Sequence, residues 1–251
     1  MAVRPRSTRG GGSTHFLRSS KLAAKLVRAA GIQPGDVVLD LGAGTGALTT
    51  ALARTRARVV AVEIDPDLAG ALRRRCPDVE VREADALRTS LPHEPFKVVS
   101  NLPFDGATAI LRRLLDPRLR LACADVIVEW GFACRRAAVW PGTQLSAYWG
   151  AWFELSVVCR LPRSAFAPPT SVDAGLLRVI RRPEPLVPPR HRRAYEGFLA
   201  SGYRDGPRAV VPGLVWKRCE AELAFDRRAR ARDLDAHQWA GLFLRSVRSS
   251  R

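Results

Sequence analysis

The sequence predicts a doubly wound α/β domain with a largely parallel sheet, followed by a small helical domain. Short apolar runs alternate with helical segments between residues 19 and 130, the order typical of strands joined by helical crossovers. Two strand-like runs, 153–161 and 174–182, follow without an obvious helix between them, which predicts an antiparallel pair at one sheet edge. Beyond a stretch rich in Pro and Arg, at 181–193, only short helical segments occur.

The individual elements follow from the period of the apolar residues. Leu22, Leu26, Val27 and Ala30 recur on one helical face and Gly31 supplies a stop, which predicts a first helix within 19–32. The same reasoning predicts helices at 47–55, 66–76 and 107–115, and strands at 36–44, 57–65, 79–85, 96–104 and 123–130. In a sheet of this kind, ligands bind at the carboxyl ends of the strands.

Three parts are expected along the 251 residues: a flexible basic tail at 1–13, a Rossmann-like domain at 14–182 and a small helical domain at 183–251. No apolar run approaches the roughly 18 residues of a membrane span, and the basic N-terminus lacks the apolar centre of a signal peptide. Five scattered cysteines form no C-x-x-C pair, and the four histidines complete no zinc spacing. We therefore expect a cytoplasmic, monomeric protein without a metal or a membrane partner.

The formal charge is +17, and most of the positive charge comes from arginine. A balance this basic predicts a polyanionic partner, nucleic acid first, because guanidinium groups fork onto phosphates and stack on bases. A membrane partner would favour a basic amphipathic helix, and no such segment is clear. Arg112, Arg113, Arg135 and Arg136 are the candidates to hold phosphates that flank a target nucleotide. The arginines of 227–232 favour electrostatic steering over base readout.

A glycine turn, "DLGAGTGAL" at residues 40–48, follows the first predicted strand and opens a helix. Gly42, Gly44 and Gly46 allow a tight turn and a close approach of the backbone to a ligand. The spacing differs from the G-x-G-x-x-G of dinucleotide sites, and the helix start lacks the Lys-Ser or Lys-Thr of a Walker A loop. The turn predicts a ligand site, but not one built for a pyrophosphate.

Acidic residues end the next two predicted strands. Glu63 lies where a carboxylate accepts hydrogen bonds from both hydroxyls of a ribose, and Asp85 where one accepts from the amino group of an adenine. An adenosine without phosphate fits S-adenosylmethionine, whose cationic sulfonium tolerates acidic neighbours. The cofactor-binding residues predicted from this region are Asp40, Gly42, Gly44, Glu63, Ile64, Asp85, Ala86 and Asn101.

The fourth predicted strand ends in "SNLPF", residues 100–104. An exocyclic amine of a base is a poor nucleophile, because its lone pair is delocalised into the ring. The side-chain oxygen of Asn101 and the carbonyl of Leu102 can each accept one of its N–H bonds, which favours a pyramidal nitrogen with an available lone pair. Pro103 stiffens the segment, and Phe104 offers a face for stacking. These residues predict N-methylation of a base amine.

Together the motifs resemble those of the Erm macrolide-resistance methyltransferases and the small-subunit rRNA adenine dimethyltransferases, from about residue 14 to 185. "SNLPF" is similar to their N-[LI]-P-[YF], and "THFL" to their Q-N-F-L, which lines the methionine end of the cofactor and adds His15 and Leu17 to the predicted set. "SAFAPPTSVD" is similar to their F-x-P-x-P-x-V-D, whose Phe, here Phe166, is placed against the target base. Thr14, His15 and Thr170 depart from these patterns.

The resemblance implies a class I S-adenosylmethionine-dependent methyltransferase with a seven-stranded Rossmann-like sheet. Because "VIVEWGFACRRA" and "WFELSVVCRLP" are similar to the Erm branch, it implies methylation at N6 of one adenosine in the peptidyl-transferase loop of 23S rRNA, with resistance to macrolides, lincosamides and type B streptogramins. The alternatives are a 16S rRNA adenine dimethyltransferase of ribosome maturation, a DNA adenine methyltransferase, whose motif usually has an acid before Pro-Pro-Tyr, and a non-catalytic RNA-binding protein on this scaffold.

Overall fold

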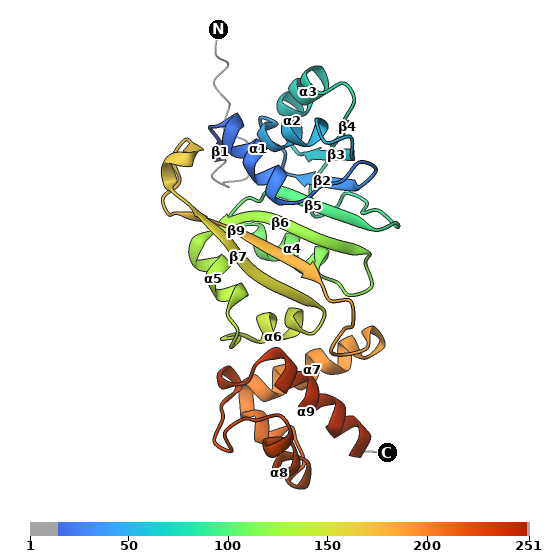
Figure 1. Cartoon of the computed structure of the whole chain (residues 1–251), viewed down its shortest axis with the longest axis vertical. Helices are drawn as coiled ribbons and strands as arrows, with labels where there is room; N and C mark the ends of the chain where they lie inside the picture. Colours follow the sequence, from blue (N-terminus) through green and yellow to red (C-terminus); the bar gives the residue numbers. More distant parts are fainter. Residues whose placement is uncertain (1–14, 250–251) are drawn as a thin grey trace.

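The computed structural model describes residues 15–249, so Thr14 and the expected basic tail at 1–13 lie outside the described residues. Within that range the chain forms a seven-stranded sheet, a separate two-stranded ladder, and helices that pack on both faces of the sheet (Figure 1). In their order across the large sheet, the strands are β4 (Glu80–Glu83), β3 (Arg58–Glu63), β2 (Val37–Leu41), β5 (Phe96–Asn101), β6 (Leu121–Glu129), β9 (Ala174–Arg181) and β7 (Phe153–Leu161). The predicted α/β class is confirmed.

The strand directions bear out the sequence pattern. β4, β3, β2, β5 and β6 pair in parallel, whereas β9 runs antiparallel to both of its neighbours, β6 and β7. The antiparallel pair predicted at one edge is therefore confirmed. β5 lies beside β2 rather than β4, so the order of the strands reverses at β2, and a crevice opens there at the carboxyl ends.

Both faces of β2 are buried, which explains its run of apolar residues. Val38 faces the cluster that includes residues of α1 (Ser20–Ala29) and α2 (Ala47–Ala53). Leu39 faces the opposite cluster, which includes α4 (Ala107–Leu114). α3 (Pro66–Arg75) begins where Asp65 caps its first turn, and Pro66 occupies the first helical position, where a missing N–H costs nothing.

Two helices were not expected from the sequence. α5 (Trp130–Ala137) follows directly on β6, and α6 (Gln144–Gly150) begins at the cap Thr143. Each spans about two turns, too short for the apolar period to stand out. The 3₁₀ helices are also short: η1 (Arg163–Ala165), η2 (Pro189–His191), η3 (Pro207–Ala209) and η4 (Ala231–Asp233).

The C-terminal part is helical, as expected, with α7 (Arg192–Asp205), α8 (Gly213–Glu222) and α9 (Ala236–Ser249) at the lower end of Figure 1. One continuous apolar cluster joins it to the sheet. Trp152 donates to Val187 O at 2.7 Å, and its ring meets Tyr195 edge-on at 5.8 Å. Because the core crosses the boundary, the division at residue 182 stays a prediction. Among the described residues, no helix is long and apolar enough to cross a membrane.

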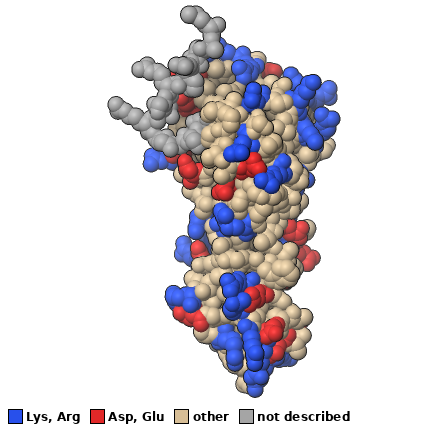
Figure 2. Space-filling view, turned by 90° about the vertical axis from the view of Figure 1, so that its left-hand side faces the viewer, with Lys and Arg blue, Asp and Glu red and all other residues tan. Residues whose placement is uncertain are grey.

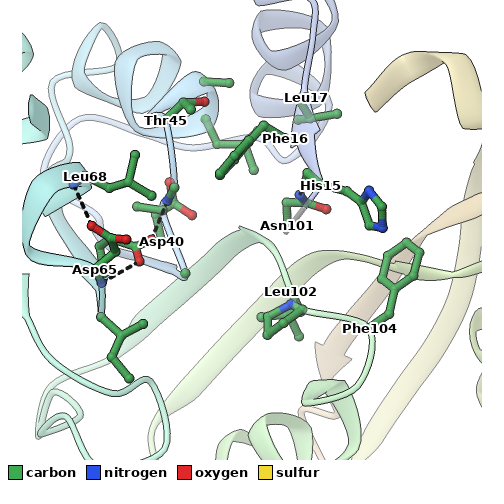
Figure 3. A pocket seen from close by; sticks show the side chains of 18 residues that line it. His15, Phe16, Leu17, Asp40, Thr45, Asp65, Leu68, Asn101, Leu102 and Phe104 are labelled. Atoms are coloured by element: carbon green, nitrogen blue, oxygen red, sulfur yellow. Dashed lines mark hydrogen bonds between the residues drawn. The ribbon is translucent and has the colours of Figure 1, made fainter. Parts of the chain in front are cut away.

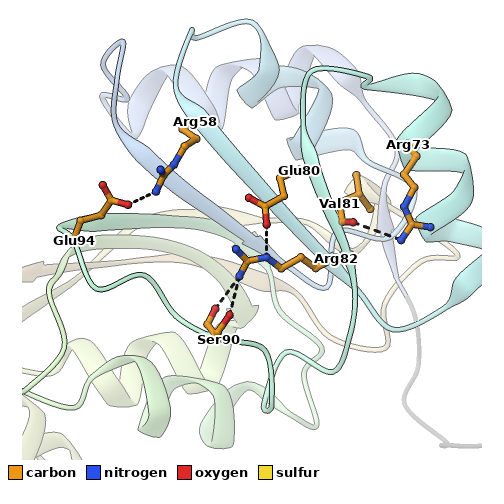
Figure 4. A network of polar contacts seen from close by, with 7 residues as sticks. All are labelled: Arg58, Arg73, Glu80, Val81, Arg82, Ser90 and Glu94. Carbon is orange, nitrogen blue, oxygen red and sulfur yellow. Dashed lines mark hydrogen bonds and ion pairs between the residues drawn. The ribbon is translucent and has the colours of Figure 1, made fainter.

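At the outer edge of the sheet, beside β3 and β4, arginines bind groups of the protein itself (Figure 4). Arg82 donates to Glu80 at 2.6 Å and to Ser90 O at 3.0 Å, and Arg58 forms an ion pair with Glu94. A large positive charge in the sequence is therefore not the same as free positive charge on the surface.

Candidate active site

A cavity of about 230 Å³ lies at the carboxyl ends of β2, β3 and β5 (Figure 3). Its walls come from the glycine turn after β2, the start of α3, the end of β5 and a short N-terminal strand, β1 (Phe16–Leu17). The lining residues are His15, Phe16, Leu17, Asp40, Gly42, Ala43, Gly44, Thr45, Ala47, Leu48, Glu63, Ile64, Asp65, Leu68, Asn101, Leu102, Pro103 and Phe104. Motifs that are far apart in the sequence thus meet at one point of the fold.

The backbone of the glycine turn has φ angles that glycine adopts more easily than other residues do. Gly42 and Gly44 have positive φ angles of 73° and 56°, a region that other L-residues adopt at a cost. A Cβ atom on Gly44 would lie 2.6 Å from the ring of Phe16, so the missing side chain also makes room for β1. The turn is further held by its own amides, since the Gly42 N–H donates to Val62 O at 2.8 Å.

Glu63 is buried at the end of β3 and holds two backbone N–H groups. Its Oε2 accepts from the Gly44 amide at 2.7 Å, and its Oε1 accepts from the Asp65 amide at 2.9 Å. The carboxylate therefore fixes the glycine turn relative to the start of α3. Each oxygen keeps further capacity to accept hydrogen bonds from a ligand, because a carboxylate oxygen has two lone pairs.

Asp40 lies under the glycine turn and is almost completely buried. The Thr49 hydroxyl donates to its Oδ2 at 2.7 Å. Burial raises the pKa of Asp40 to about 7, and the nearby Glu63 carboxylate adds to the rise, while the hydrogen bond from Thr49 opposes it. Asp40 thus changes charge near neutral pH, at the wall of the cavity.

The side-chain amide of Asn101 is fixed in direction at the end of β5. Its Nδ2 donates to His15 O at 2.8 Å, and its Oδ1 is buried with no hydrogen-bond partner among the described residues. An unpaired buried acceptor costs roughly 1–3 kcal/mol, so a ligand that donates a hydrogen bond there would be favoured. Figure 3 shows Asn101 beside His15, with Leu102 and Phe104 on the same side of the cavity.

Two distant segments close the cavity together, and we call them the roof strands. β1 pairs antiparallel with β8 (Phe166–Ala167), which places Leu17 opposite Phe166. The ladder extends on both sides, because Arg18 N–H donates to Ala165 O at 2.9 Å and His15 Nδ1 lies 3.0 Å from Pro168 O. The roof strands and their flanking residues belong to the "HFL" and "SAFAPP" segments, and no local pattern places these two segments side by side.

Most of the predicted cofactor residues line this cavity: His15, Leu17, Asp40, Gly42, Gly44, Glu63, Ile64 and Asn101. Asp85 and Ala86 are not among the lining residues. The Asp85 carboxylate accepts from the Leu87 amide at 2.8 Å in the loop after β4. Their contact with an adenine stays a prediction, and it requires the ligand to extend past the rim near Ile64, whose side chain is 66% exposed.

The predicted catalytic residues divide into two groups. Leu102, Pro103 and Phe104 line the cavity with Asn101, and the Phe104 ring lies 6.2 Å from that of His15. Phe166 does not reach the cavity, because its ring is fully buried in the apolar cluster under β8. Its stacking role against a target base, expected from the resemblance, therefore stays a prediction.

Two of the four arginines predicted to contact phosphates bind groups of the protein itself, and their contact with RNA stays a prediction. Arg113 donates to Ala86 O at 2.8 Å and also to Thr89 O, so it holds the loop after β4. Arg136 donates to Thr143 Oγ1 at 2.8 Å and stacks 5.0 Å from the centre of the Phe132 ring. Burial lowers the pKa of both guanidinium groups. A guanidinium has many donors, so a sequence pattern cannot tell an internal clamp from a free charge.

Arg112 and Arg135 remain available for a polyanion. Both side chains are exposed at the ends of their helices, α4 and α5. Arg135 lies 3.9 Å from Glu129, which is a loose contact, and Arg112 has no ion pair within residues 15–247. Burial lowers the pKa of Arg136, and the charges of Arg135 and Arg112 lower it further.

Several lining residues were not predicted, chiefly Phe16, Thr45, Asp65 and Leu68. Asp65 had a signal, since it follows Glu63 by two residues and precedes Pro66 at a helix start. Phe16 lies within the "THFL" motif, and its place in the cavity depends on the pairing of the roof strands.

The family model described as ribosomal RNA adenine dimethylase matches residues 8–202 of this chain. The chain is 35% identical over 241 residues to the mycinamicin-resistance protein MyrB of Micromonospora griseorubida, covering 91% of this chain and 76% of that protein. It is 32% identical over 250 residues to the ribosomal RNA small subunit methyltransferase A of Synechococcus sp., covering 91% and 89%.

Among solved structures, the chain is similar to the 23S rRNA methyltransferase ErmE, with a TM-score of 0.81 and 29% identity. The superposition covers 92% of this chain and 99% of that chain, so it includes the C-terminal helices as well as the sheet. The likeness therefore extends over the architecture as a whole.

Proposed function

The chain belongs to the ribosomal RNA adenine dimethylase family, and from that premise we propose that it methylates N6 of one adenosine in the peptidyl-transferase loop of 23S rRNA. A methyl group there would obstruct macrolides, lincosamides and type B streptogramins, so the proposed effect is resistance to these drugs. The names of MyrB and ErmE support this branch of the family. The observation that carries the chemistry is the buried, unpaired Oδ1 of Asn101 at the cavity.

The residues that line the cavity suit S-adenosylmethionine as the methyl donor. Gly42 and Gly44 bring the backbone close to a ligand, and the Glu63 carboxylate keeps lone pairs for ribose hydroxyls. Asp40, when ionised, adds a negative charge that suits a cationic ligand. Bound here, the cofactor would supply an electrophilic methyl group.

The residues at the end of β5 act on the amine of the target base. Oδ1 of Asn101 and the carbonyl oxygen of Leu102 would each accept one N–H bond, which withdraws the lone pair from the ring and leaves it free to attack. Asn101 can hold this direction because its Nδ2 is tied to His15 O at 2.8 Å. The amine becomes acidic as it gains the methyl group, so its surplus proton passes to water without a dedicated base.

The ring of Phe104 would stack against one face of the target base. It is half-buried at the cavity, and the His15 ring lies 6.2 Å away at 43° to it. An N6 group in a base pair cannot enter the cavity, so the adenosine must be unpaired or turned out of its helix. Arg112 and Arg135, whose side chains are exposed, would hold phosphates that flank it.

Methyl transfer from labelled S-adenosylmethionine to unmethylated 23S and 16S rRNA tests the proposal, with the product mapped by primer extension and nucleoside mass spectrometry. We expect one labelled adenosine in the peptidyl-transferase loop of 23S rRNA and none in 16S rRNA. Asn101→Ala is the matched control, since it removes the acceptor and should leave cofactor binding almost unchanged. Label on neither RNA would contradict the enzymatic proposal and revive a non-catalytic scaffold.

The second candidate is a 16S rRNA adenine dimethyltransferase of ribosome maturation. The specific observation in its favour is the 32% identity to the small-subunit methyltransferase of Synechococcus sp., which is nearly as high as that to MyrB. Label on 16S rRNA alone in the same assay would move the chain to that branch. Both candidates use the same cavity and the same chemistry at Asn101.

A further inference from the structure

We propose that the imidazole of His15 stacks on the target base, on the face opposite to Phe104. We call the space between these two rings the base slot. The inference rests on the proposed function in one respect, namely that a base enters the cavity beside Asn101. It assigns the side chain of His15 to the RNA substrate, whereas the resemblance assigns the motif of His15 to the cofactor.

The two rings face one another at the cavity. Their centres are 6.2 Å apart and their planes are inclined by 43°. Both residues line the cavity and both are half-buried, so a ligand can reach part of each ring. In Figure 3 the two rings lie together on one side of Asn101, while Asp40 and Asp65 lie on the other side. The imidazole therefore points away from the acidic end of the cavity, where we propose the cofactor.

The base slot adjoins the atom proposed to accept from the amine. Nδ2 of Asn101 donates to His15 O at 2.8 Å, so the backbone of His15 orients the amide while its side chain faces Phe104. Oδ1 of the same amide is the buried acceptor without a partner among the described residues. A base whose amine donates to this oxygen brings its own ring beside the two aromatic side chains. One position of the base therefore satisfies its edge and both of its faces.

The imidazole is held in one orientation. Its Nδ1 lies 3.0 Å from Pro168 O, and because a carbonyl oxygen only accepts hydrogen bonds, Nδ1 is the nitrogen that carries the proton. Pro168 directly follows β8, so the pairing of the roof strands sets the place of the ring. A side chain that is fixed before its ligand arrives loses less entropy on binding.

The spacing of the rings is close to what a base requires. A base between two parallel rings needs about 7 Å from ring to ring, because each stack holds carbon atoms about 3.5 Å apart. The slot must therefore widen by about 1 Å, and the planes must become parallel. The bond to Pro168 holds the imidazole, whereas the ring of Phe104 has no polar atom and stands in the loop after β5. We expect Phe104 to make this adjustment.

His15 offers a stacking face without any opening of the core. The resemblance places Phe166 against the target base, but that ring is fully buried in the apolar cluster under β8. A base would reach Phe166 only after the cluster opened, which exposes apolar surface to water at a cost. Histidine is among the side chains on which RNA bases stack. In this chain it stands where the Q-N-F-L motif has an asparagine, which has no ring.

The stack should matter more for the reaction than for the binding of RNA. Figure 2 shows Lys and Arg side chains on one face of the molecule, over the sheet and over the C-terminal helices. An RNA held through its phosphates at several such points keeps most of its affinity when one base contact is lost. The fraction of time that the base spends in the slot falls nevertheless, so the loss appears in kcat.

Fluorescence of 2-aminopurine tests the base slot directly. The probe is an rRNA hairpin in which 2-aminopurine replaces the adenosine that the wild-type protein methylates, because the fluorescence of this purine is quenched when it stacks. We expect quenched fluorescence in the wild-type complex and several-fold brighter fluorescence with His15→Ala, which leaves one face of the base free. His15→Phe should restore most of the quenching, since it keeps a ring face and loses only the bond to Pro168.

Kinetics on the unmodified hairpin give the second readout. With labelled S-adenosylmethionine, kcat of His15→Ala should fall by about 5- to 150-fold, the range for loss of one base–aromatic stack. Filter binding should give a hairpin Kd within a few-fold of the wild type, and calorimetry a cofactor Kd within a few-fold. His15→Asn should resemble His15→Ala, because an amide offers no ring. All of these variants keep the backbone carbonyl that orients Asn101.

His93→Ala is the matched control, because it removes an exposed imidazole at a distance from the cavity. His93 lies in the loop before β5, at the other end of that strand from Asn101. Fluorescence and kcat of this variant should equal those of the wild type.

Three results would overturn the proposal. Wild-type fluorescence and kcat in His15→Ala would assign the second face of the base to another residue, such as Phe166. A large loss of cofactor affinity with unchanged fluorescence would assign the imidazole to the cofactor. Equal losses in His15→Phe and His15→Ala would show that the bond to Pro168 matters and the ring face does not.

Failure of this proposal differs from failure of the proposed function. If the wild-type protein labels no rRNA, the proposed function is wrong and this inference falls with it. If the wild type labels an adenosine and His15→Ala labels it equally fast, the proposed function stands and this inference alone is wrong.

Discussion

The catalytic cavity and a hollow at the C-terminal helices use polar side chains in opposite ways. We call the second the arginine hollow, after its residues Arg208, Arg227, Arg228, Arg230 and Arg232. In the cavity, Asp40, Glu63 and Asn101 are held by bonds to their own protein, and Oδ1 of Asn101 is a buried acceptor with no partner among the described residues. In the arginine hollow, exposed guanidinium groups such as those of Arg208 and Arg232 have no partner in the described structure. Chemistry needs atoms at fixed positions, whereas attraction of RNA needs charge that can adapt. The two properties should therefore respond to different mutations and different conditions.

The largest effect is expected for Asn101→Ala, which removes the free acceptor of the cavity. We expect kcat to fall by about 10²- to 10³-fold, the usual loss when one preorganised group facing developing charge is deleted. Calorimetry should give a cofactor Kd within a few-fold of the wild type, and filter binding an unchanged RNA affinity. Turnover that survives the substitution would remove Asn101 from its role.

The next largest effect is a dependence of protein stability on pH, which we expect from Asp40 in the cavity. Because burial raises the pKa of Asp40 to about 7, the folded protein holds a proton that the unfolded chain releases near pH 4. The free energy of unfolding contributed by this group should fall as pH rises from about 4 to 7, by up to about 1.4 kcal/mol per pH unit.

Urea unfolding of the wild type and Asp40→Asn at several pH values isolates that contribution, since other carboxyl groups are common to both proteins. We expect the difference between the two proteins to change through this window and to be constant above it. A constant difference across pH 4 to 7 would contradict the raised pKa. RNA binding at the arginine hollow should respond to salt in the same window, not to this titration.

Gly44→Ala should open the roof of the cavity. The added Cβ would lie 2.6 Å from the Phe16 ring, in a residue with a φ of 56°. We expect cofactor affinity to fall by about 10-fold or more, since a backbone strain of roughly 1–3 kcal/mol is added to the clash. Gly31→Ala is the matched control, because its φ is 60° and its Cβ meets nothing. If both variants bind cofactor equally well, the clash between a side chain at residue 44 and the Phe16 ring does not affect cofactor binding.

The smallest effect contrasts two neighbouring arginines. Arg113→Ala removes the two hydrogen bonds to the loop after β4 and should lower cofactor affinity several-fold, with RNA affinity kept. Arg112→Ala removes an exposed charge and should do the reverse, with a loss of about 1 kcal/mol or less in RNA binding. If both variants lose cofactor affinity and RNA affinity to the same extent, the two neighbouring arginines do not differ in role.

The sequence predicted the parts of the site that lie at strand ends. Gly42, Glu63 and Asn101 each end or follow a strand whose apolar run is clear, so a parallel sheet brings them together without further information. The same logic predicted the fold class and the antiparallel edge. These successes depend on local pattern and on one rule of topology.

The rest depended on contacts between distant residues. The pairing of the roof strands joins Leu17 to Phe166, and no local pattern of two residues predicts a partner so far along the chain. Arg113 and Arg136 were expected on the surface because a charge beside a site suggests a ligand, yet backbone carbonyls and hydroxyl groups of the protein hold them. The burial of Phe166 has the same origin.

The roof strands have a consequence for synthesis of the protein on the ribosome. The N-terminal strand emerges first, but β1 has no partner until residues 166 and 167 have left the exit tunnel. The carbonyl of His15 that anchors Asn101 therefore gains the support of this pairing only after more than two thirds of the chain has been translated. A nascent chain halted at residue 160 would carry every motif of the glycine turn and of β5, and would still lack the cover that completes its cavity.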